Sequence, residues 1–142
     1  MYQTYDVAGM IIPGGKNAIS AWQLVFMKGM IADSVTGQWP NPNSGGSNIK
    51  MWSRNHFLFV GQFRSDTSIS PNYGWGTYKL DGNRYEEIAL YHVRPWYVGD
   101  TVKMLLEIKN DTLIQTFPVD DNGQINKSKS GYYILEKYIR LD

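Results

Sequence analysis

The connections between the β-rich segments of this chain are short, and they constrain its fold more than any other feature of the sequence. Two-residue turns fit at Arg54-Asn55, at Asp81-Gly82 or Gly82-Asn83, and at Asn110-Asp111. Two residues can join antiparallel neighbours, whereas parallel neighbours need a crossover of about a dozen residues or more. The sequence therefore predicts a meander of antiparallel hairpins.

Eight segments are rich in Val, Ile, Tyr, Phe, Trp or Thr, the residue types that favour strands, and no convincing helix lies between any two of them. These segments are residues 21–28, 47–53, 56–64, 74–81, 84–94, 101–109, 112–119 and 131–140. Consecutive hairpins favour an up-and-down barrel over a two-sheet sandwich, because a sandwich usually needs long crossovers between its sheets. We therefore predict an all-β fold, an eight-stranded antiparallel up-and-down barrel.

The composition limits the number of domains and the classes of partner. With 142 residues, the chain suits one domain, which we expect at residues 19–142 after an N-terminal arm at residues 1–18. A net charge of +1 without runs of like charge gives no basis for a nucleic-acid partner. No stretch approaches the roughly 20 apolar residues of a membrane helix, so we expect no membrane span.

Cysteine is absent, which excludes disulfides, thiol catalysis and thiolate metal sites. His56 and His92 are the only histidines, and they lack the spacing of a metal-binding helix. We therefore expect neither a metal site nor a cofactor.

Short turns also determine which side chains share a face, because side chains alternate along a strand. At the Gly82 turn, the face expected inside carries Gly76, Tyr78, Leu80, Tyr85, Glu87, Ala89 and Tyr91, while Lys79 and Glu86 pair on the other. At the Asn110-Asp111 turn, the inner face carries Val102, Met104, Leu106, Ile108, Leu113, Gln115, Phe117 and Val119.

For the hairpin at Arg54-Asn55, either of two sets of side chains could form the inner face. One set is Trp52, Phe57, Phe59 and Phe63 with Lys50, and the other is Met51, Leu58 and Val60 with His56 and Arg64. The aromatic set is the favoured interior.

Four stretches carry a family resemblance: Ala21-Trp22-Gln23-Leu24, residues 49–60, residues 76–87 and residues 136–141. Together they resemble the bacterial lipocalin-like domains of the calycin superfamily, many of which are exported. The resemblance implies that a basic residue of the last strand, Arg140, covers Trp22 of the first strand, although Ser20 stands where lipocalins have glycine. It also implies a loop at residues 30–48 over the open end, and a periplasmic or secreted protein whose leader is missing from this chain.

Polar side chains on the predicted inner face are the candidate functional residues, because burying them costs free energy unless they are paired. They are Tyr78, Tyr85, Glu87, Tyr91 and Gln115. One interpretation is an internal network or a wet barrel mouth, and the other is contact with a ligand. Arg64 or Arg140 could pair with Glu87.

The ligand interpretation predicts a non-enzymatic binding protein that encloses a small apolar or amphipathic ligand. Its pocket is expected to be lined by Trp22, Phe57, Phe59, Tyr78, Tyr91 and Phe117, with Glu87 and Gln115 as polar anchors.

Two alternatives remain open. A filled barrel could recognise a protein or a carbohydrate through loop tryptophans, and this predicts that Trp39, Trp75 and Trp96 cluster on one surface. A small enzyme could use Glu87 as acid or base, and this requires an open pocket with a second ionisable group.

Overall fold

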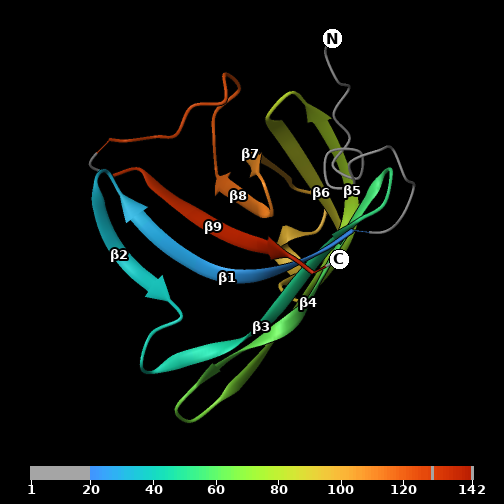
Figure 1. Cartoon of the computed structure of the whole chain (residues 1–142). Helices are drawn as coiled ribbons and strands as arrows, with labels where there is room; N and C mark the ends of the chain where they lie inside the picture. The colour runs from blue at the N-terminus through green and yellow to red at the C-terminus, as the bar shows by residue number, and fades with distance from the viewer. Residues whose placement is uncertain (1–19, 129, 142) are drawn as a thin grey trace.

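The computed structural model describes residues 20–128 and 130–141, so the predicted arm at residues 1–18 lies outside the described residues. This part of the chain folds into one antiparallel sheet of nine strands (Figure 1). The elements are β1 (Ser20–Ile31), β2 (Ser34–Trp39), β3 (Ser44–Trp52), β4 (His56–Ser65), β5 (Ile69–Asp81), β6 (Arg84–His92), the 3₁₀ helix η1 (Pro95–Tyr97), β7 (Thr101–Lys109), β8 (Thr112–Phe117) and β9 (Tyr132–Arg140). Within the described ranges, no helix is long and apolar enough to cross a membrane.

The sheet closes because the first and last strands pair. β3 to β9 follow one another in sequence order, and β9 pairs with β1 from Trp22 opposite Arg140 to Ile31 opposite Tyr132. Eight strands, β1 and β3–β9, therefore form a closed antiparallel barrel, which confirms the predicted fold class and is compatible with a lipocalin-like fold. The guanidinium of Arg140 lies 5.6 Å from the ring centroid of Trp22, so the expected closing contact is present.

The expectation of a loop at residues 30–48 is wrong, because β2 lies within this stretch. β1 is twelve residues long, and its two halves pair with different strands on the same side. Ser20 to Gln23 pair with β3, whereas Met27 to Ile31 pair with β2. Apart from Trp39, every residue of β2 is exposed, so this strand has no buried apolar alternation that could have revealed it.

The three predicted tight turns are confirmed. They lie between the pairs Trp52–Phe57, Asp81–Arg84 and Lys109–Thr112, and Lys79 faces Glu86 as expected. Gly82 and Asn110 adopt positive φ angles of 63° and 56° in two of these turns. The favoured inner face of β4 is also confirmed, because Phe57 is 2% exposed and its neighbour Leu58 is 42% exposed.

One inward assignment is wrong. Gly76 pairs with Ala89, but the next pair is Trp75 with Tyr91, so Leu90 is an extra residue on β6. Such a β-bulge reverses the alternation of side chains beyond it. Tyr91 is consequently 53% exposed and stacks on Tyr73, while His92 packs edge-on against the inner residue Phe59, with ring centroids 5.4 Å apart.

Candidate functional site

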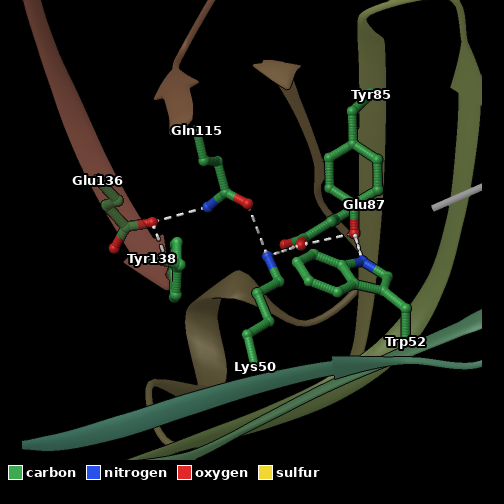
Figure 2. Close-up of polar contacts among 7 residues, drawn as sticks. All are labelled: Lys50, Trp52, Tyr85, Glu87, Gln115, Glu136 and Tyr138. Atoms are coloured by element: carbon green, nitrogen blue, oxygen red, sulfur yellow. Dashed lines mark hydrogen bonds and ion pairs between the residues drawn. The ribbon is translucent and has the colours of Figure 1, made fainter. Parts of the chain in front are cut away.

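A lysine of β3 forms an ion pair inside the barrel with a glutamate of β6. Lys50 Nζ binds Glu87 Oε1 and also donates to Gln115 Oε1 of β8 at 3.0 Å (Figure 2). The lysine and glutamate side chains are 4% and 9% exposed. One side chain therefore connects three strands across the interior of the barrel.

The alternation along β3 directs Lys50 inward, because Asn48, Lys50 and Trp52 are its buried residues. Its ammonium lies 5.1, 5.4 and 5.5 Å from the ring centroids of Trp52, Phe57 and Tyr85. Contacts between a cation and aromatic rings are stronger when water is excluded. These rings therefore offset part of the cost of taking the ammonium out of water.

Tyr85 connects the ion pair to the indole of Trp52. Its hydroxyl donates to Glu87 Oε1 at 2.8 Å and accepts from Trp52 Nε1 at 2.7 Å. Burial, followed by the nearby Glu87 carboxylate, raises the pKa of Tyr85 well above its ordinary value. Tyr85 therefore stays protonated and acts as a fixed hydrogen-bond donor.

The network continues on the other side of Lys50 to a second carboxyl group. Gln115 Nε2 donates to Glu136 Oε1 at 2.7 Å, and the Tyr138 hydroxyl donates to the same oxygen at 3.1 Å. Burial raises the pKa of Glu136, although the Lys50 charge and these hydrogen bonds oppose the rise. The ammonium of Lys50 thus bonds directly to only one of the two carboxyl groups, and Glu136 has no cation of its own among the described residues.

A hollow of about 320 Å³ lies beside this network, against β1, β2 and β9. It is lined by Met27, Gly29, Thr36, Gly37, Gln38, Trp39, Tyr132 and Ile134, none of which is charged. Four of these residues belong to β2, the strand that replaces the expected loop. The network is closed and polar, whereas the hollow is open and mostly apolar.

None of the eight predicted ligand-binding residues lines the hollow. Glu87 and Gln115 belong to the network, and Trp22, Phe57, Phe59, Tyr78 and Phe117 lie in the packed core or against it. Tyr91 lies on the outer face. Their role as ligand contacts stays a prediction. The partner of Glu87 is Lys50, and neither Arg64 nor Arg140 pairs with it in the described part of the chain.

The predicted surface of three tryptophans is wrong. Trp39 is buried, donates its indole N–H to the Gly45 carbonyl at 2.9 Å and packs edge-on against Phe63. Trp75 and Trp96 are exposed. The buried position of Trp39 removes it from any surface shared with the other two.

The enzyme alternative also finds no site in the described residues. Glu87 is buried in its ion pair and does not line the hollow, as an acid or base acting on a substrate there would. Between residues 20 and 141, leaving out residue 129, no group of three or more His, Asp or Glu side chains could hold a metal ion.

No family model matches this chain, and no curated protein or solved structure matches it either.

Replacing Lys50 with Met should lower the free energy of unfolding by about 3–5 kcal/mol, because Glu87 would stay buried without its cation. The double variant Lys50→Met/Glu87→Gln should recover much of this loss. Urea unfolding measures both values. Lys103→Met, at the exposed pair with Asp121, is the matched control and should change stability little. A single variant as stable as the parent, or a double variant no better than the single, would contradict the network as described.

Glu136 should make stability depend on pH, because the folded protein holds its proton to a higher pH than the unfolded chain does. The stabilisation from this group is complete below its ordinary pKa of 4.5 and is lost as pH rises through the raised pKa of the folded state. Glu136→Gln removes the titration. The stability of the parent relative to this variant, from urea unfolding at several pH values, should fall with rising pH and then level off. A relative stability that is constant or rises with pH would show that burial does not raise this pKa.

Proposed function

We propose that this protein is a non-enzymatic binding protein for a small amphipathic molecule, whose apolar part occupies the hollow between β1, β2 and β9. The observation that carries the proposal is the hollow itself, because its volume of about 320 Å³ falls within the range of ligand pockets. Met27, Trp39 and Ile134 give it the apolar walls of such pockets.

Two glycines that face each other line the hollow. Gly29 of β1 pairs with Gly37 of β2. A Cβ atom at Gly29 would stand 2.7 Å from the Tyr132 hydroxyl and 2.8 Å from Thr36 Oγ1, so only glycine leaves these side chains where they are. A Cβ atom at Gly37 would meet nothing within 4 Å, which supports unfilled space beside β2.

The surrounding barrel supports binding more than catalysis. Among the described residues, Lys50 pairs with Glu87, and Glu136 accepts from Gln115 and Tyr138, whereas the hollow is lined by uncharged residues. A wall with few polar groups suits the retention of a ligand.

Filling the hollow should abolish binding of an apolar probe. We expect N-phenylnaphthylamine to become fluorescent on binding the parent protein, and Ile134→Trp to reduce its affinity at least about tenfold by occupying the space. Ile139→Trp is the matched control, because Ile139 lies on the exposed face of the same strand. It should bind the probe as the parent does.

A second variant that fills the hollow separates loss of the binding space from misfolding of Ile134→Trp. Gly37→Leu places its side chain in the same space from β2 and should weaken probe binding similarly. Absence of binding by the parent, or unchanged binding by both filling variants, would overturn the proposal. Native mass spectrometry of gently purified protein would identify a ligand that co-purifies.

A further inference from the structure

We infer that the ligand carries a primary ammonium group, which pairs with the carboxylate of Glu136 at the inner end of the hollow. This inference rests on the proposed function, since it names the chemistry of the ligand's polar end. It depends on the position of Glu136, on its unused oxygen and on the charge balance of the interior.

On β9, Glu136 is the next inward-facing residue after Ile134, which lines the hollow. On β9, Ile134 and Glu136 lie on the same face, because side chains two residues apart point the same way. On the facing strand, Gly29 pairs with Ile134 and Met27 pairs with Glu136. Ile134, Gly29 and Met27 all line the hollow. Glu136 is not itself a lining residue, and a molecule reaches it by extending along this ladder past Met27 and Ile134.

One oxygen of Glu136 is free to accept a further hydrogen bond. Oε1 accepts from Gln115 and Tyr138, while no described residue donates to Oε2. Figure 2 shows the second oxygen directed away from Gln115 and Tyr138. The described side-chain polar atoms that are shielded from solvent and make no hydrogen bond belong to Trp22 and Arg140, so Oε2 is accessible to solvent. Glu136 is also partly exposed, whereas Glu87 and Gln115 are buried.

The charge balance favours a cation over an anion at this place. The ammonium of Lys50 is engaged by Glu87 and Gln115 and enclosed by three aromatic rings. A ligand carboxylate would therefore meet Glu136 before any cation, and the two carboxylates repel each other when Glu136 is ionised. A ligand ammonium would supply the missing positive charge, and the Trp39 and Tyr132 rings of the lining also favour a cation.

The test compares octylamine, octanol and octanoate, which differ only at the polar end, in displacement of N-phenylnaphthylamine from the whole chain. We expect octylamine to bind at least about tenfold more tightly than octanol, because a charge-assisted hydrogen bond contributes more than a neutral one. Octanoate should bind most weakly. Glu136→Gln should abolish the preference for octylamine over octanol, and a far-UV circular dichroism spectrum like that of the parent shows that the variant is folded.

Glu107→Gln, which alters an exposed carboxylate on β7, is the matched control and should bind all three compounds as the parent does. Equal binding of octylamine and octanol, or an amine preference that survives Glu136→Gln, would overturn the ammonium inference while the hollow still binds ligand. Failure of all three compounds and of the probe to bind would overturn the proposed function itself.

Discussion

The ion pair between Lys50 and Glu87 is the interaction on which the arrangement of the barrel interior depends. Two charges removed from water must be paired and hydrogen-bonded, because an isolated buried charge costs several kcal/mol. This requirement fixes β3 against β6 and, through Gln115, against β8. A one-residue slip of β3 would turn Lys50 to the outside and leave Glu87 without a cation. The pair therefore favours one register among those that the apolar residues alone would accept.

The interior has two parts, the closed polar network around Lys50 and the open hollow against β1, β2 and β9. Around Lys50, aromatic rings and hydrogen-bond partners enclose the ammonium. Glu136, the carboxyl group without a cation, follows Ile134 of the hollow's wall on the same face of β9. Gly29 and Gly37 remove side chains where the two strands face each other. The polar residues that stabilise the interior and the residues proposed to bind the ligand thus lie in neighbouring regions, and Glu136 belongs to both sets.

The hairpins could be predicted from the sequence because a two-residue turn fixes both the partner strand and the register. Tyr78, Glu87 and Gln115 were correctly placed inside on this basis. The bulge at Leu90 broke the same rule locally, and no turn residue marked it. The link from Lys50 to Glu87 depends on how strands far apart in sequence face each other across a closed barrel, and local patterns carry no such information. Glu136 was missed because no tight turn determined which face of β9 points inward, and β2 was missed because its side chains are mostly exposed.

The proposed function requires a ligand to bind in the hollow between β1, β2 and β9. Backbone amide chemical shifts followed by NMR during titration with octylamine locate the bound molecule. We expect the largest shifts to cluster at Gly29, Gly37 and Ile134, and to extend to Glu136. Shifts confined to the outer face around Trp75 and Tyr91, where aromatic rings are exposed, would contradict it.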